Sequence, residues 1–516
     1  MSFASRLGRA IFWSQAGRLA EVVLLFFFSL VLARVLGPSS YGIYAVGISL
    51  AGLCGFLALA GLGPETLGRF LPEVVAGGKR DRARGLLVRL GAIRGAAILF
   101  LAALVFWFRG ELAARFHLSP GATAIALVLL VFVSRSLYDL LTNFSSGLLE
   151  MRRVAGAKMA GALVPPILIF IFWLSGAAGT NAAWLATAAG SLAGMLILAV
   201  PFFSVQPRAD AADRFPVRRI LAFGMFTWVT VLFVYILGDN TDVLLLGWLL
   251  PDRAAIGQYA LGAKIAFTLN ALLLGWASLV SVASFSEAWQ QGGAARLGKL
   301  VEAQWKLGVL SLAGPSLLVM RYAREIVEVF YSRAYAASVP VLQILCGLLC
   351  VAALFGFTLV TSALYATSHE RLACGLVAAA AAFNLVAEIF LVRRMGIRGA
   401  AWATGLSFVL LAIGSTIAGR FYIPWRFPLV FTAKVLAASV LALAPTFWIR
   451  PDSGVVLAAG IVVWGVAFLC CLGILKPLEE MESAALGRMN PRLGELAAMF
   501  GPRAAAAPAG AAAWRE

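Results

Sequence analysis

The sequence is poor in the residues that build metal centres and acid–base sites. Its 516 residues include only two histidines, His117 and His369, and six cysteines. No two cysteines form a CxxC pair, so we predict that they are small packing residues. Walker motifs, glycine-rich phosphate loops and nucleophile elbows are also missing from suitable positions. We therefore expect no cofactor, no metal ion and no enzymatic reaction.

Charged residues are scarce as well. They make up 13% of the chain, about half the share in an average soluble protein, whereas 62% of the residues are hydrophobic. A helical membrane span needs about 20 mostly apolar residues, and segments of that length fill the sequence almost end to end. We predict an all-α integral membrane protein with about fourteen transmembrane helices. We expect the first helix to be retained, because another span follows it within a few residues.

Acidic residues are fewer than basic ones, with 24 Asp and Glu against 42 Lys and Arg and a net charge of +18. In a soluble chain this excess would suggest nucleic-acid binding. Here most basic residues fall in loops on one side of the predicted membrane, including the stretches 69–89, 152–158 and 208–219. This positive-inside pattern predicts a multi-pass protein with both termini in the cytoplasm. We expect it to contact membrane lipids and no nucleic acid.

Three motifs recur at nearly the same distance along the chain. The pairs are GIYAVG at 42–47 with GQYALG at 257–262, SSGLLEMRRVAG at 145–156 with TSALYATSHERLACG at 361–375, and GTNAAW at 179–184 with GIRGAAW at 396–402. Each match is weak alone. Their common offset of 215 to 218 residues indicates that spans one to six and seven to twelve are two copies of one unit.

Six spans in each copy place both copies in the membrane from the same side. The repeat therefore predicts two pseudo-symmetric six-helix lobes, the plan of alternating-access transporters that hold a substrate between their halves. We predict an N-lobe at 1–203, a cytoplasmic linker at 204–216, a C-lobe at 217–420, two further spans at 421–475 and a cytoplasmic, partly disordered tail at 476–516.

The opening of the sequence resembles a known family. LGPSSYGIY at 36–44, GLG at 61–63 and RFLPE at 69–73 follow the pattern of polysaccharide transporters, or Wzx-type oligosaccharide flippases, of the multidrug/oligosaccharidyl-lipid/polysaccharide (MOP) exporter superfamily. The resemblance implies a flippase of the bacterial inner membrane that moves a polyprenyl-diphosphate-linked oligosaccharide from the inner to the outer leaflet. It also implies glycosyltransferases and a polymerase as partners in the synthesis of a polysaccharide such as lipopolysaccharide. We expect the flippase to act as a monomer.

Charged side chains inside the spans mark the candidate site. A charge at mid-membrane depth costs about 2.5 to 3.5 kcal/mol, so such residues usually face a bundle interior or a wet cavity. Arginine also presents a planar fork of donors that matches phosphate oxygens. We predict that a cationic cavity for the diphosphate and its sugars is lined by Arg18, Glu21, Arg94, Arg135, Asp139 and Lys264.

Three further acids are candidates for gating or for binding a coupling ion, either H⁺ or Na⁺. Asp239 and Asp242 belong to the predicted seventh span at 217–249, and Glu388 belongs to the eleventh. A second interpretation stays open for every one of these charges. They can form ion pairs that hold helices in register, as the spacing of Arg18 and Glu21 would allow.

Two other functions also stay open. A multidrug or cation antiporter of the same superfamily would place acidic residues deep in its lobes. A polysaccharide polymerase or membrane glycosyltransferase would place catalytic residues on a large outside loop, but the outside loops predicted here are short. Because the deep charges have both signs and include several arginines, we favour the flippase.

Overall fold

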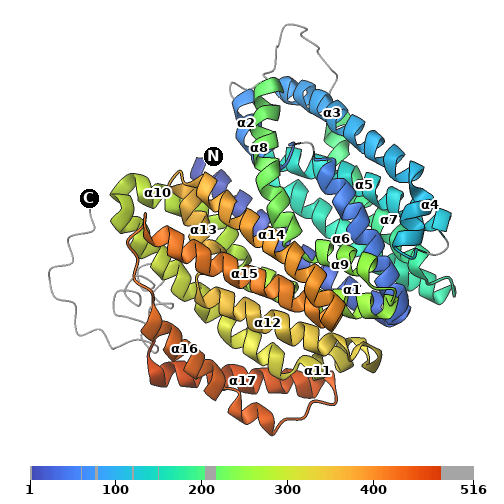
Figure 1. The fold of residues 1–516 in the computed structure, drawn as a ribbon. Helices are drawn as coiled ribbons and strands as arrows, with labels where there is room; N and C mark the ends of the chain where they lie inside the picture. Colours follow the sequence, from blue (N-terminus) through green and yellow to red (C-terminus); the bar gives the residue numbers. More distant parts are fainter. Residues whose placement is uncertain are drawn as a thin grey trace. The chain divides into compact units, whose positions relative to one another are not determined.

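The computed structural model describes residues 3–59, 61–75, 80–118, 121–148, 150–203 and 217–477. Within these ranges the chain is helical and contains no β-strand (Figure 1). The predicted linker at 204–216 and nearly all of the predicted tail lie outside the described residues. The helices are α1 (Phe3–Leu57), α2 (Pro64–Val75), α3 (Arg80–Trp107), α4 (Arg109–Arg115), α5 (Gly121–Gly147), α6 (Met151–Leu174), α7 (Thr180–Phe203), α8 (Val217–Ile236), α9 (Asp239–Leu249), α10 (Arg253–Arg321), α11 (Ala323–Ile326), α12 (Ser338–Leu354), α13 (Phe357–Ala366), α14 (Glu370–Met395), α15 (Ile397–Arg420), α16 (Leu429–Leu441) and α17 (Gly454–Leu475), with short π or 3₁₀ turns η1 (Val327–Tyr331), η2 (Arg333–Tyr335) and η3 (Ala444–Phe447).

Among the described residues, ten helices are long and apolar enough to cross a membrane, or up to eleven if a bent pair counts as one span. The prediction of an all-α membrane protein is confirmed, whereas the count of fourteen spans stays a prediction. The first two predicted spans lie on the single helix α1, which is broken at Gly37, where φ is +70°. Pro38 follows at once and has no N–H to continue the helical hydrogen bonds. The break therefore divides α1 into two halves.

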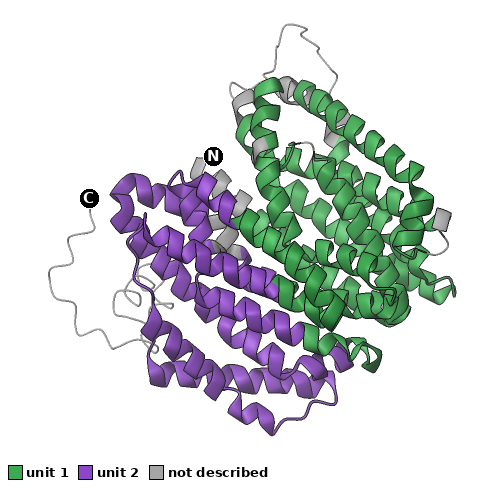
Figure 2. Cartoon of the chain, viewed as in Figure 1, with its two compact units in different colours: residues 1–268, 331–341, 377–404 green, residues 269–330, 342–376, 405–516 purple. Residues whose placement is uncertain are grey.

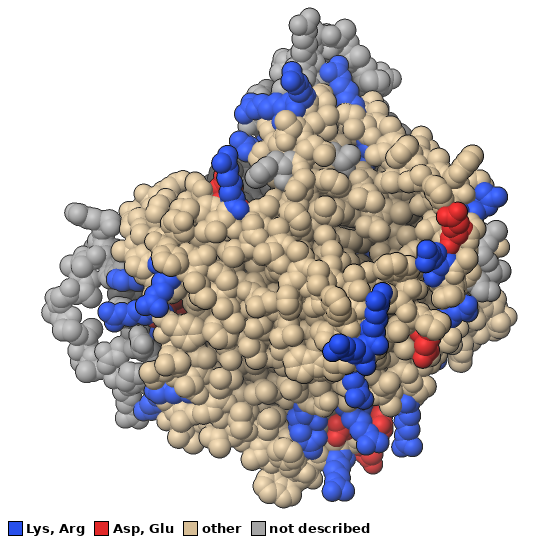
Figure 3. Space-filling model, in the orientation of Figure 1, with Lys and Arg blue, Asp and Glu red and all other residues tan. Residues whose placement is uncertain are grey.

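The surface matches the hydrocarbon interior of a membrane. Large apolar side chains are widely exposed, for example Leu99 at 72%, Trp107 at 81% and Phe421 at 83%. On the face drawn in Figure 3, most of the surface comes from residues other than Lys, Arg, Asp and Glu. Such exposure would be unfavourable in water, and it is what contact with lipid chains requires.

The described helices form two compact units (Figure 2). The first unit, which we call unit 1, comprises Met1–Thr268, Tyr331–Val341 and Val377–Thr404. The second, unit 2, comprises Leu269–Phe330, Leu342–Leu376 and the described residues from Gly405 onward. The unit boundaries fall inside α10, α12, α14 and α15, so the division into lobes at 1–203 and 217–420 stays a prediction.

Unit 1 is held together by close helix contacts at small residues and by buried aromatic side chains. A Cβ atom on Gly190 of α7 would lie 2.5 Å from the carbonyl oxygen of Gly161 on α6, so only glycine fits this contact. Helices in membranes typically pack through such small residues. Trp184 is fully buried, and its Nε1 donates a hydrogen bond to the carbonyl oxygen of Tyr44, at 3.3 Å. This contact fixes α7 against the second half of α1.

Candidate functional site

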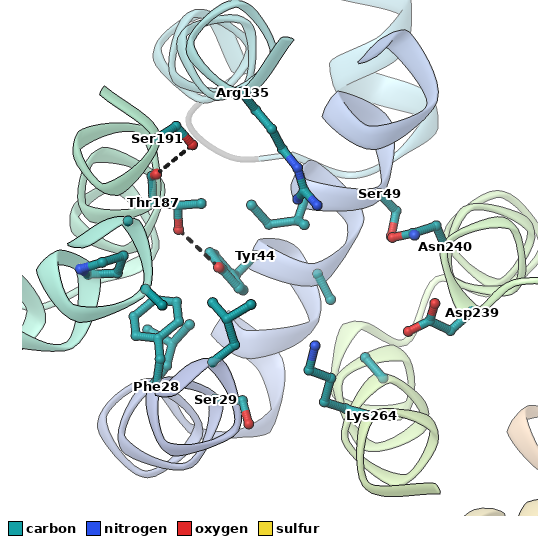
Figure 4. Close-up of a pocket in the computed structure, with 18 of the residues that line it drawn as sticks. Phe28, Ser29, Tyr44, Ser49, Arg135, Thr187, Ser191, Asp239, Asn240 and Lys264 are labelled. Carbon is teal, nitrogen blue, oxygen red and sulfur yellow. Dashed lines mark hydrogen bonds between the residues drawn. The ribbon is translucent and has the colours of Figure 1, made fainter. Parts of the chain in front are cut away.

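Unit 1 encloses a cavity of about 280 Å³ (Figure 4). Six helices line it: α1, α5, α6, α7, α9 and α10. Because α1 is broken at Gly37, it contributes twice, with Glu21 and Ser29 from its first half and Tyr41, Tyr44 and Ser49 from its second. The break thus lets one stretch of chain form two sides of the cavity.

Three basic side chains line the cavity. Arg135 comes from α5, Lys158 from α6 and Lys264 from α10. Figure 4 shows Arg135 and Lys264 reaching inward from opposite sides. Nζ of Lys158 lies 2.7 Å from Oε2 of Glu21, and the side chains of both residues are only about one quarter exposed. The two residues form an ion pair between α6 and the first half of α1.

The acidic side chains in the lining equal the basic ones in number. They are Glu21, Asp139 and Asp239. Asp139 lies within electrostatic reach of Arg135 and of Lys158. The cavity is therefore lined by both signs of charge, and two of its basic side chains, Arg135 and Lys158, have acidic neighbours. An anionic ligand that enters must compete with these carboxylates for the same donors.

Hydroxyl and aromatic groups form another part of the lining. The Tyr44 hydroxyl and Oγ1 of Thr187 are hydrogen-bonded at 3.0 Å, and Thr187 also donates to the carbonyl oxygen of Ala183 at 2.8 Å. Ser49 donates to Oδ1 of Asn240 at 3.3 Å. Hydroxyls, an amide and aromatic rings are groups that bind sugars, because they can exchange hydrogen bonds with hydroxyls and cover apolar ring faces.

The structure brings together most of the side chains predicted to line a cavity. The cavity is lined by four of the six predicted residues, Glu21, Arg135, Asp139 and Lys264. It is also lined by Asp239, which was predicted for gating or coupling. Two others lie elsewhere, so their predicted cavity roles stay untested.

Arg18 is half-buried on α1 and is not part of the lining. Arg94 is fully buried on α3, where it interacts electrostatically with Asp139. Its Nε and Nη1 make no hydrogen bond with a described residue. Asp139, which lines the cavity, is therefore the residue that connects Arg94 to it.

Lys158, Tyr44 and Thr187 line the cavity but were not predicted to do so. Lys158 falls within a basic stretch that looks like a topology signal, yet α6 begins at Met151 and carries the lysine two turns into the helix. Tyr44 belongs to the repeated GIYAVG motif. That repetition is the signal that could have drawn attention to it.

The other two predicted acids meet in a second site of unit 1, which we call the carboxyl cluster. It consists of Asp242, Tyr259, Asn384, Glu388 and Thr404. Asp242 and Glu388 are both fully buried. The Tyr259 hydroxyl and the Thr404 hydroxyl, the latter at 2.8 Å, both donate to Oδ2 of Asp242. Nδ2 of Asn384 donates to Thr404 at 3.2 Å.

Several oxygens of the carboxyl cluster have no hydrogen-bond partner among the described residues. They are Oδ1 of Asp242, Oδ1 of Asn384 and both carboxyl oxygens of Glu388. Glu388 and Asp242 are close enough to interact electrostatically, but no well-formed hydrogen bond joins them. Two adjacent carboxyl groups this deeply buried need compensation. Either one of them takes up a proton, or a bound cation offsets their negative charge.

The seventh predicted span explains how both sites receive an acid from neighbouring positions. Instead of one helix over 217–249, the chain forms α8 and α9, with Gly238 extended between them (ψ 159°). The start of α9 thereby brings Asp239 and Asn240 to the cavity, while Asp242 reaches the carboxyl cluster.

Comparison with known proteins bears on the family and the fold. Residues 7–289 match the family model described as polysaccharide biosynthesis protein. The chain belongs to this family. A search of curated protein sequences finds no match. The matched residues cover more than half of the chain, so the family description, polysaccharide biosynthesis protein, applies to it.

The fold is similar to those of solved transporters. A structure of the lipid II flippase MurJ in an inward closed conformation matches with a TM-score of 0.69 and 16% identity, over 90% of this chain and 98% of that one. An inward-facing multidrug resistance MATE family transporter of the MOP superfamily matches with a TM-score of 0.66 and 14% identity, over 79% and 97%. At such low identity the likeness concerns the fold alone.

Proposed function

We propose that this protein is a flippase that carries a polyprenyl-diphosphate-linked oligosaccharide from the inner to the outer leaflet of the bacterial inner membrane. The observation that supports the proposal most is the cavity of unit 1, where Arg135, Lys158 and Lys264 lie beside a wall of hydroxyl and aromatic groups. Guanidinium and ammonium groups suit a diphosphate, and the hydroxyl wall suits sugars. The family and the fold agree with this assignment.

Binding would exchange partners in the cavity. The diphosphate would take the place of Glu21 and Asp139 beside the basic side chains, and the displaced carboxylates would accept hydrogen bonds from sugar hydroxyls. The prenyl chain would stay in the lipid. Outward movement of two negative charges is favourable in a cell with a negative interior, by about 2.3 kcal/mol per charge per 100 mV. The protein has to lower the cost of removing water from the head group.

The test is a flipping assay in proteoliposomes with a fluorescent polyprenyl-diphosphate-linked disaccharide. A membrane-impermeant quencher then reports how much label has reached the far leaflet. We expect Arg135→Ala and Lys264→Ala each to slow flipping by about tenfold or more, since a hydrogen bond to a charged group contributes about 1.5 to 3 kcal/mol.

Arg394→Ala is the matched control, because Arg394 is exposed at the end of α14 and far from the lining in sequence. It should flip the lipid at the wild-type rate. Normal flipping by both cavity variants would disprove the assignment of the cavity to the diphosphate.

Export of organic cations is the second candidate function, and the acids of the cavity favour it. Glu21, Asp139 and Asp239 could bind a cationic drug as carboxylates. An antiporter of this kind would expel ethidium from cells and lose that activity in Glu21→Gln. Ethidium export without lipid flipping would replace the first proposal with this one.

We propose further that the carboxyl cluster binds the coupling ion, H⁺ or Na⁺. Its unpartnered oxygens are hard ligands of the type that a proton or a small cation needs, and its buried acids need compensation. In purified wild-type protein we expect NaCl, relative to choline chloride, or a lower pH to raise the melting temperature.

Glu388→Gln should remove this response. Glu21→Gln, which changes a cavity acid outside the carboxyl cluster, should keep it. A response that Glu388→Gln leaves intact would place the coupling ion elsewhere.

A further inference from the structure

Two glycines of the repeated motif face each other in unit 1. A Cβ atom on Gly42 would lie 2.0 Å from the carbonyl oxygen of Arg253 and 2.8 Å from N of Gly257. A Cβ atom on Gly257 would lie 2.0 Å from the carbonyl oxygen of Pro38 and 2.9 Å from N of Gly42. Each glycine thus faces the carbonyl four residues before the other one. The contact is reciprocal, as a two-fold relation between two repeats requires.

A second contact of this kind involves Gly61, in the turn that follows the end of α1 at Leu57. A Cβ atom on Gly224 of α8 would lie 2.0 Å from the carbonyl oxygen of Gly61, and one on Gly61 would lie 2.7 Å from the carbonyl carbon of Gly224. Side-chain contacts support this approach. Oγ1 of Thr66 and Oγ1 of Thr227 are 3.4 Å apart.

Each contact joins the first copy of the repeat to the second. Gly42 and Gly61 belong to the predicted N-lobe, and Gly257 and Gly224 belong to the predicted C-lobe. Four cavity-lining residues, Tyr44, Ala45, Ile48 and Ser49, lie between the two glycine positions in the sequence. Neither contact leaves room for a side chain, so backbone meets backbone at both ends.

We propose that the Gly42–Gly257 contact and the Gly61–Gly224 contact are the two gates of the cavity, which separate in turn during the transport cycle. The inference rests on the proposed alternating-access function. Backbone contacts suit a gate, because they can close tightly without reordering any side chain and can separate without leaving a charged group unpaired. With the predicted topology, the Gly42 gate faces outward and the Gly224 gate faces the cytoplasm.

The proposal predicts opposite effects for substitutions at the two gates. Gly42→Ala and Gly257→Ala should hold the outer gate open, and Gly224→Ala should hold the inner gate open. Gly156→Ala on α6 is the control, because no atom lies within 4 Å of its added Cβ position. It should leave both gates unchanged.

The measurement is the labelling of a reporter cysteine, Ser49→Cys, in a protein whose six native cysteines are replaced. A membrane-impermeant methanethiosulfonate is added to right-side-out or to inside-out membrane vesicles. We expect several-fold faster labelling from outside in Gly42→Ala and Gly257→Ala, and several-fold faster labelling from the cytoplasmic face in Gly224→Ala.

A reversible lock tests the inner gate without adding a methyl group at a glycine. The pair Thr66→Cys and Thr227→Cys should form a disulfide on oxidation, since the native hydroxyls are 3.4 Å apart. The oxidised protein should lose labelling of residue 49 from the cytoplasmic face, keep labelling from outside and stop flipping. Reduction should restore both activities.

These outcomes distinguish a failure of the gate proposal from a failure of the proposed cargo. Labelling needs no lipid-linked sugar, so opposite changes in labelling without any flipping would support the gates and reject the proposed cargo. Flipping by wild-type protein with unchanged labelling in all three glycine variants would reject the gates alone. Faster labelling from one and the same face in Gly42→Ala and Gly224→Ala, or full flipping by the oxidised lock, would also overturn the proposal.

Discussion

The two copies of the G-x-Y-A-x-G motif place their tyrosines in different surroundings. In the first copy, the Tyr44 hydroxyl is hydrogen-bonded to Thr187 at 3.0 Å, beside the cavity. In the second copy, the Tyr259 hydroxyl and Thr404 both donate to Asp242. Tyr259 follows Tyr44 by 215 residues, so the two tyrosines occupy matching places in the repeat, whereas Thr404 lies one residue short of the position that matches Thr187 at the 218-residue offset of Trp184 and Trp402.

The site of the second copy contains two buried acids, Asp242 and Glu388. Offsets of 215 to 218 match Asp242 to the stretch 24–27, which reads Leu-Leu-Phe-Phe and carries no charge. The Tyr259 hydroxyl thus donates to an acid, whereas the Tyr44 hydroxyl is paired with Thr187. Divergence of this kind can give one half of a duplicated transporter the cargo and the other half the coupling ion.

Asp242→Asn tests this comparison with the largest expected effect. It removes the acid that accepts from Tyr259 and Thr404 and keeps the side chain's size. We expect the flipping rate to fall by about tenfold or more, the factor that corresponds to about 1.4 kcal/mol of transition-state stabilisation. Unchanged flipping by this variant would mean that the added acid is a structural feature of the second copy.

Tyr259→Phe should have an intermediate effect, on stability. It removes one of two donors from a buried carboxyl, and a hydrogen bond to a charged group contributes about 1.5 to 3 kcal/mol. Thermal unfolding in detergent should show a lower melting temperature. Thr404→Val removes the other donor and should act in the same direction. If neither variant lowers the melting temperature, Asp242 does not depend on these hydroxyls.

Tyr44→Phe should have the smallest effect. The bond it removes is between neutral groups and contributes about 0.5 to 1.5 kcal/mol, and Thr187 keeps its bond to the carbonyl oxygen of Ala183. The melting temperature should fall less than in Tyr259→Phe, measured under the same conditions. An equal or larger fall would remove the distinction between the neutral and the acidic copy.

The fold could be predicted from the sequence because its strongest signals are local. Apolar length identifies the long apolar helices, whereas the repeat inferred from the shared offset of the motifs stays a prediction. The break in α1 is also visible locally as Gly37 followed by Pro38. By contrast, the division of 217–249 into α8 and α9 falls within a continuous apolar run, and length alone could not reveal it.

The site could be predicted only in part. Charges deep in the spans pointed to Glu21, Arg135, Asp139 and Lys264, because a charge in lipid needs a wet or charged neighbour. Helical spacing shows which residues of one helix share a face, but not which helix lies opposite. The Lys158–Glu21 pair, separated by 137 residues, depends on how α6 packs against α1, and one sequence does not contain that information.

Helix α9 is only 11 residues long, yet it belongs to both sites. Asp239 and Asn240 border the space for the cargo, and Asp242 lies one turn further on among the buried acids. Both acids lie in the first turn of α9, so a displacement of that turn would move both. If the cavity binds the proposed cargo and the carboxyl cluster the proposed ion, thermodynamic linkage requires the factor by which the ion changes the affinity for the cargo to equal the factor by which the cargo changes the affinity for the ion.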